Sequence, residues 1–209
     1  MRRIGLILTI VLGVSFCSFA QNVDTFRPRL KLSMLGGINA VSSRNWTVGF
    51  LDRVTPNFQI GLEYDFQPWI GIRLAGSGPL GVYPDINIKY TQPTTKFHYF
   101  QIAADVKMDL LRMFSDSNTH MVNPYFFAGI LGYNRSETDK VKSHLGAGVR
   151  TGLGLGVNMG PLVRFILEGQ LNLLGNDFNS IKDLHVFGAD GDSNFAVLTG
   201  FLVTLGARK

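Results

Sequence analysis

The sequence predicts an all-β protein, namely an eight-stranded antiparallel transmembrane β-barrel with an up-and-down meander. Side-chain polarity alternates with a period of two residues rather than 3.6, which is typical of strands with one apolar face. After residue 20, no unbroken apolar run reaches the ~18–20 residues that a transmembrane helix needs, although 45% of the chain is hydrophobic and only 17% is charged. Short and long connections between the predicted strands alternate, as they do in outer-membrane barrels.

The N-terminal residues have the pattern of a secretory signal peptide. Two arginines precede an apolar stretch, and small residues lie before the expected cleavage site after Ala20. We therefore expect residues 1–20 to be removed and residues 21–209 to form one outer-membrane barrel domain. Two alternatives stay open, an uncleaved membrane anchor and lipidation of Cys17.

Cleavage at this site would change both the disulfide chemistry and the charge. It removes Cys17, the only cysteine, so the exported chain must be stabilised by packing and backbone pairing. Loss of the two arginines lowers the formal net charge from +5 to +3, and these charges are scattered along the chain. Such a charge gives no support for a nucleic-acid partner.

Eight alternating segments follow in order. In residues 96–110, the even positions are mostly apolar and the odd positions include glutamine, aspartate and lysine. In residues 145–158, leucine and valine alternate with glycine, and residues 163–172 alternate too except at Ile166. The eight predicted strands are residues 29–40, 57–66, 70–77, 96–110, 124–133, 145–158, 163–172 and 195–207.

The lengths of the connections predict which end of the barrel is which. Outer-membrane barrels have short turns on the periplasmic side and longer loops on the outer side. The two short connections and the medium one therefore belong to the periplasmic end, and the four long ones to the outer end. The short connections are residues 67–69 and 159–161, the medium one is 111–123, and the long ones are 41–56, 78–95, 134–144 and 174–194.

Alternation also predicts the register at both short turns, because a slip of one residue would move apolar side chains to the polar face. At the first turn it pairs Glu63 with Arg73. At the second turn it pairs Gly152 with Glu168. In this register the glycines of the sixth strand leave room for the long polar side chains of the seventh.

Charged residues gather on the inward face of these strands. In hydrocarbon every backbone polar group must be paired within the protein, so the sheet must close. Eight strands enclose a lumen just wide enough for side chains. Because both signs occur in equal number, we expect an ion-paired network that plugs the lumen. The predicted network comprises Glu63, Arg73, Asp105, Lys107, Asp109, Arg150, Arg164 and Glu168.

Aromatic residues cluster near the predicted strand ends, which is typical of the girdles at the two membrane interfaces. The alternative is the core of a soluble β-sandwich or a lipocalin-like barrel. In a soluble barrel the apolar face would point inward, and the glycine-rich sixth strand would expose bare backbone to water. The predicted interfacial aromatics are Tyr64, Phe66, Trp69, Tyr125 and Phe126.

Four features together resemble the OmpA/PorT-like outer-membrane β-barrel proteins over the whole mature chain. They are the signal peptide, the opening strand at residues 29–33, the turn and strand at residues 67–73, and the Gly/Leu-alternating sixth strand. The resemblance implies a role beside envelope protein-export machinery, with no catalytic residues. The chain departs from many such barrels in lacking a terminal aromatic residue, which bears on how the insertion machinery recognises it.

Candidate sites for chemistry are weak. A lipid A-modifying enzyme would need a nucleophile and a base near the outer rim. Ser143 and His144 are adjacent on a strand, so their side chains point to opposite faces and cannot form a relay. The other candidates for this chemistry are His98, His185, Glu137, Asp139 and Asp183.

A calcium site and other cofactors are also not predicted. Residues 190–194 resemble the start of a calcium loop, but Phe195 and Phe201 stand where an EF-hand needs glycine and glutamate.

The leading hypothesis is a non-enzymatic integral outer-membrane protein with a plugged polar lumen, which acts as a structural, surface-loop interaction or complex-partner protein. Its expected partners are outer-membrane lipid and lipopolysaccharide, the barrel-insertion machinery and an unidentified envelope protein. A narrow pore for small solutes and a lipid A-modifying enzyme are the alternatives.

Overall fold

The computed structural model describes residues 29–42, 54–79, 83–84, 96–114, 121–137, 143–175 and 192–205. Within these ranges the chain forms eight long strands, one two-residue strand and one short helix. Residues 1–20, predicted to be a signal peptide, and most of the long connections lie outside the described residues. In order, the elements are β1 (Arg29–Ser42), β2 (Val54–Asp65), β3 (Ile70–Pro79), β4 (Tyr83–Pro84), β5 (Lys96–Asp109), α2 (Leu110–Phe114), β6 (Val122–Glu137), β7 (Ser143–Asn158), β8 (Val163–Leu174) and β9 (Asp192–Leu205).

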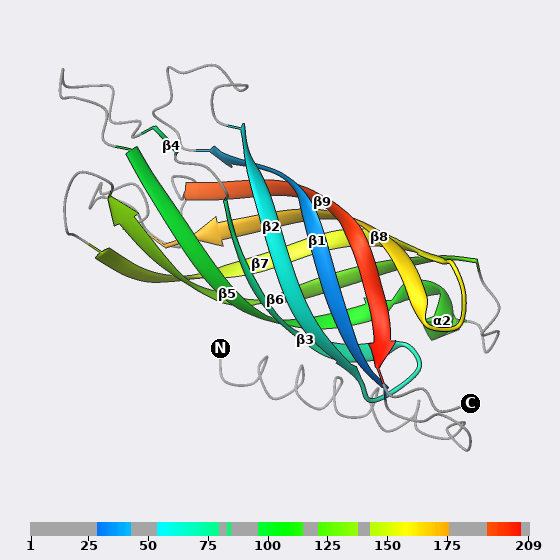
Figure 1. Cartoon of the computed structure of the whole chain (residues 1–209). Helices are drawn as coiled ribbons and strands as arrows, with labels where there is room; N and C mark the ends of the chain where they lie inside the picture. The colour runs from blue at the N-terminus through cyan, green and yellow to red at the C-terminus, as the bar shows by residue number, and fades with distance from the viewer. Residues whose placement is uncertain are drawn as a thin grey trace, which may run out of the picture.

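The eight long strands close into a barrel (Figure 1). Each pairs antiparallel with its neighbour in the chain, and β1 pairs with β9 to complete the ring, blue beside red in Figure 1. β3 pairs directly with β5, while β4 adds only a two-residue pairing to the end of β5. The predicted closed, eight-stranded antiparallel meander is therefore confirmed.

The medium connection contains a helix that alternation did not predict. Leu110, expected as the last residue of a strand, is the first residue of α2. The Asp109 side chain accepts a hydrogen bond from the backbone N–H of Arg112 at 3.2 Å, which caps the first turn. Leucine, arginine and methionine then favour the helix. No helix in the described part of the chain has the length and apolar character needed to cross a membrane.

The predicted register is confirmed at the first short turn and wrong at the second. At the first, Glu63 pairs with Arg73 as predicted. At the second, Glu168 pairs with Gly154 instead of Gly152. Met159 N–H donates to the carbonyl of Val163 at 3.0 Å, so the turn is two residues longer than predicted. A shift of two residues leaves every side chain on its face, so alternation cannot distinguish the two registers.

The glycines of β7 make room mainly for aromatic rings of β6, not for polar chains of β8 as predicted. A Cβ atom at three of these glycines would overlap a ring on the inward face of β6. At Gly156 the neighbour is the Arg164 side chain of β8, whereas at Gly148 and Gly152 the atoms that β8 contributes belong to its backbone. The facing pairs are Gly146 with Tyr133, Gly152 with Phe127, and Gly154 with Tyr125.

The two faces of the barrel differ sharply in exposure. Large apolar side chains are exposed around the outside, among them Leu74 at 57%, Leu153 at 63% and Ile130 at 68%. The inward side chains are buried, and Ile166, the apolar exception on β8, is fully buried among them. The outer surface is therefore apolar and the interior largely polar, which is the reverse of a soluble barrel.

Candidate functional site in the barrel lumen

Arg73 of β3 is the centre of the buried charges. It is 1% exposed, and its Nε atom donates to Asp105 Oδ2 at 2.9 Å. Its Nη1 atom donates to Glu168 Oε1 at 2.5 Å, across the lumen on β8. Glu63 Oε1 on β2 lies 3.9 Å from the same nitrogen. One guanidinium therefore joins carboxylates from three other strands.

A second arginine and a ring complete this cross-section of the lumen. Arg150 Nη2 of β7 lies 3.1 Å from Asp105 Oδ2, so the two arginines share one carboxylate. The Arg73 and Arg150 guanidinium carbons lie 4.4 and 5.3 Å from the centre of the Phe127 ring, within cation–π range. These side chains pack against one another inside the barrel at this level.

Lys107 and Tyr125 extend the network toward the turn end of the barrel. Lys107 Nζ donates to Glu63 Oε2 at 2.8 Å and lies 4.0 Å from the centre of the Tyr125 ring. The Tyr125 hydroxyl donates to Glu168 Oε1 at 2.6 Å. We call the six charged residues of this network the charged core. Its members are Glu63, Arg73, Asp105, Lys107, Arg150 and Glu168.

Charge balance explains how six ionised groups tolerate burial. The charged core contains three cations and three carboxylates, each in an ion pair with another member. Burial of an ion is costly unless a partner of opposite sign and hydrogen bonds replace water. The balance of charge therefore offsets part of the cost of burying these groups in the lumen.

The aromatic residues expected at the membrane interfaces take different positions. Tyr125 is 1% exposed and lies inside the barrel, which corrects its predicted interfacial place. Its neighbour Phe126 faces outward, as do Tyr64 and Phe66 at 42% and 40% exposure. Trp69 lies in the first short turn and lines the mouth of the lumen. Tyr125 points inward because it has the parity of the inward residues of β6.

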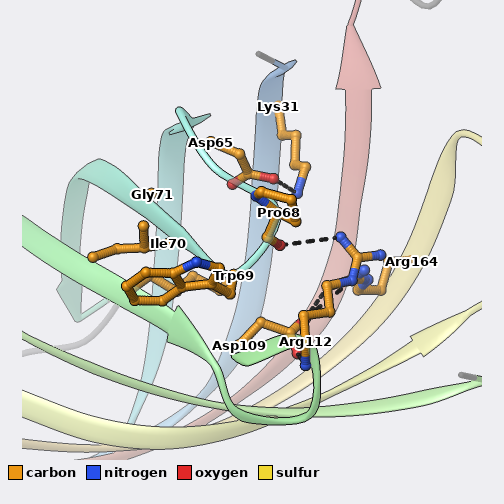
Figure 2. A pocket seen from close by; sticks show the side chains of 10 residues that line it. Lys31, Asp65, Pro68, Trp69, Ile70, Gly71, Asp109, Arg112 and Arg164 are labelled. Carbon is orange, nitrogen blue, oxygen red and sulfur yellow. Dashed lines mark hydrogen bonds and ion pairs between the residues drawn. The ribbon is translucent and has the colours of Figure 1, made fainter. Parts of the chain in front are cut away.

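Asp109 and Arg164, also predicted to point inward, lie at the mouth rather than in the charged core. Arg164 Nη1 is 3.8 Å from Asp109 Oδ2, and Arg112 Nε of α2 is 3.6 Å from the same oxygen. Lys31 pairs with Asp65 on the other side of the opening (Figure 2). Sequence reasoning missed Lys31, Asp65 and Arg112, although Lys31 and Asp65 occupy inward-facing parities.

A layer of mostly amide side chains, which also contains the buried Arg135, covers the charged core on the side of the long connections. Gln170 Nε2 donates to Glu168 Oε2 at 2.9 Å and to Gln59 Oε1 at 3.1 Å, which joins the two layers. Tyr99 accepts hydrogen bonds from Asn39 and Asn194. The predicted network contained only charged residues, although the alternation of side chains also places these amides on the inward face. Its amide side chains, all buried, are Asn39, Gln59, Gln101, Gln170, Asn172 and Asn194.

The candidates for lipid A chemistry are not brought together in the described part of the chain. Ser143 is exposed and donates to Asn134 Oδ1 at 3.0 Å, and His98 is also exposed. The side chains of His144 and Glu137 lie outside the described residues, as do His185, Asp139 and Asp183. Across the described ranges, no group of three or more His, Cys, Asp or Glu residues is placed to hold a metal ion.

An apolar exterior around a closed, charge-filled interior is the architecture of small outer-membrane β-barrels. The structure is similar to Neisserial surface protein A, with a TM-score of 0.58 and 16% identity over 83% of this chain and 96% of that chain. It is also similar to Ail, the attachment invasion locus protein of Yersinia pestis, solved in complex with the heparin analogue sucrose octasulfate. For Ail the TM-score is 0.51, with 13% identity over 85% of this chain and 99% of that chain.

Comparisons of sequence add no family assignment. No protein-family model matches the chain, and no curated protein matches it. At 16% and 13% identity, the two structural similarities show a shared barrel fold alone. The chain is thus an eight-stranded β-barrel of the outer-membrane type, and its role must be argued from its own residues.

Proposed function

We propose that this chain is a non-enzymatic integral protein of the bacterial outer membrane. The observation that carries the proposal is the ring of exposed apolar side chains on all eight long strands, around an ion-paired interior. A soluble monomer rarely exposes apolar patches beyond a few hundred Å². In lipid this surface is favourable, and closure of the sheet pairs the backbone groups that hydrocarbon cannot solvate.

The proposed orientation follows from the two ends of the barrel. Short periplasmic turns and long outer loops are the rule for these proteins. The end with residues 66–69, α2 and residues 159–162 would then face the periplasm. We further propose export by a signal peptide cleaved after Ala20, assembly by the barrel-insertion machinery, and contact with membrane lipid and lipopolysaccharide.

The role proposed for the barrel is an anchor rather than a channel. The charged core joins side chains of β2, β3, β5, β7 and β8 across the lumen, which supports the proposal that it blocks the passage of solutes at that level. Function would then lie in the long connections or in a partner protein. The OmpA/PorT-like features of the sequence favour a partner in the envelope protein-export machinery, which pull-down from outer-membrane extracts can identify.

Substitution of a lipid-facing leucine tests the membrane proposal. Leu153→Arg is expected to destabilise the barrel in lipid vesicles by about 2–4 kcal/mol, because it places a cation in the hydrocarbon. Leu145→Arg, on the same face of β7 but near its end, is expected to cost about 0–1 kcal/mol. Urea unfolding of each variant in vesicles gives the two values. Equal, negligible costs would show that this face of β7 meets water.

Conductance tests the plugged lumen. The wild-type protein in planar bilayers is expected to give no stable single-channel steps, because the charged core closes the lumen. Regular steps of uniform size would instead support the alternative of a narrow pore.

Lipid A isolated with and without the protein is expected to have the same mass, and a mass change that depends on the protein would support the enzyme alternative.

A further inference from the structure

The turn end of the lumen contains a small cavity with an excess of positive charge (Figure 2). Four cationic side chains and only two carboxylates line it. Lys31 is paired with Asp65, and Lys107 with Glu63 of the charged core. Within the ranges that the structure describes, the remaining two cations, Arg112 and Arg164, share one carboxylate, that of Asp109.

The guanidinium groups of these two arginines are incompletely neutralised. Their nitrogen atoms lie 3.6 and 3.8 Å from Asp109 Oδ2, beyond the ~2.7–2.9 Å of a charge-assisted hydrogen bond. Arg164 donates from Nε to Asn158 Oδ1 at 2.8 Å, and Arg112 donates from Nη1 to the Pro68 carbonyl at 3.4 Å. The other carboxyl oxygen of Asp109 accepts the Arg112 backbone N–H. Counting the described residues alone, the mouth carries one positive charge in excess.

The size of the cavity limits what can enter it. Its volume is about 20 Å³, which is enough for one water-sized group. It lies at the opening of the lumen, between the first short turn and α2, so a larger molecule could insert only its terminus. Arg112 and Arg164 both line the cavity, and their planar guanidinium groups carry donors that match the oxygens of phosphate and carboxylate.

We propose that this mouth binds an oxyanion, a phosphate or carboxylate group that enters from the turn end and accepts hydrogen bonds from Arg112 and Arg164. Under the proposed orientation the anion comes from the periplasmic side, and this part of the inference rests on the proposed function. Its source is a soluble periplasmic molecule or the headgroup phosphate of a lipid in the adjacent leaflet.

Inorganic phosphate is the probe that tests the site. Purified protein in neutral detergent is unfolded by heat at increasing phosphate, with ionic strength held constant by sodium chloride. We expect a saturable rise in Tm for the wild type. Arg112→Gln and Arg164→Gln are each expected to raise the Kd for phosphate at least tenfold. Arg112→Lys keeps the charge but loses the fork, so its Kd should lie between those of the wild type and Arg112→Gln.

Arg29→Gln is the matched control, because Arg29 is an exposed arginine of the same barrel end that does not line the cavity. Its Kd should stay within twofold of the wild type. Equal phosphate effects in all variants, or an equal effect of chloride, would overturn the proposal. A folded wild type with no phosphate effect would overturn it too, and would leave membrane insertion, measured separately in vesicles, unaffected.

Bicelles distinguish the two sources of the oxyanion. If the phosphate effect seen in neutral detergent is lost in bicelles of phosphatidylcholine and phosphatidylglycerol, whose headgroups both carry a phosphate, the site is filled by lipid headgroup phosphate. If the effect persists with phosphatidylglycerol present, the site selects a soluble oxyanion. In both cases Arg112→Gln must weaken the response, since the same two guanidinium groups make the contacts.

Discussion

Arg73→Gln is expected to lower the free energy of unfolding of the barrel by about 3–5 kcal/mol, the usual cost of removing one partner from a buried ion pair. Arg73 contacts Asp105 and Glu168 directly, and both carboxylates are fully buried. Without the guanidinium, the charged core holds three carboxylates against two cations. Urea titration in vesicles, followed by the mobility of unboiled protein in detergent gels, gives the free energy.

The double variant Arg73→Gln/Glu168→Gln separates charge imbalance from loss of packing. It restores the balance of the charged core at two cations and two carboxylates, so it should recover part of the lost stability. Arg29→Gln, at an exposed site, should change stability by less than about 0.5 kcal/mol. An Arg73→Gln barrel as stable as the wild type would show that the ion pairs do not hold the lumen together.

Gly152→Ala is expected to destabilise the barrel by about 2–3 kcal/mol, the upper part of the range for overpacking. A Cβ atom at this position overlaps both the Phe127 ring and the backbone carbonyl of Gly169 on β8. The ring cannot move freely because Arg73 and Arg150 both pack on it. The added methyl group therefore has to displace a strand or separate the Phe127 ring from the guanidinium groups packed on it.

Gly160→Ala is the control for this substitution. It adds the same methyl group in the turn between β7 and β8, where no atom lies within 4 Å of the new position. It should leave the urea midpoint unchanged. Equal effects of the two substitutions, large or small, would contradict the steric role assigned to Gly152.

The alternation of side chains predicted the faces of the barrel because each strand has a fixed period of two. It placed Glu63, Arg73 and Glu168 on the inward face, and it paired Glu63 with Arg73. It could not predict that Arg73 contacts Glu168, because these residues are 95 positions apart and meet only when the sheet closes. Partners across a lumen depend on register and closure, and neither is local.

Each of the three errors has a physical origin. The predicted register at the second short turn is wrong by two residues, because a shift of two residues leaves every side chain on the same face of the sheet. Tyr125 was assigned to an interface from its position near a strand end, whereas its parity on β6 directs it inward to Glu168. The helix α2 was not predicted because five residues are too few to show a helical period in the sequence. The sequence therefore predicts which face of the sheet a side chain occupies, whereas its position along the barrel axis depends on how the strands pair.

The most direct test of the central claim, that the apolar exterior of this barrel is inserted in the outer membrane, is the gel mobility of the protein from fractionated membranes. The account predicts that it is recovered in the outer-membrane fraction, needs detergent to stay dispersed, and migrates differently in detergent gels before and after boiling. Protein that stays in aqueous solution after detergent is removed, with one mobility whether boiled or not, would contradict the account.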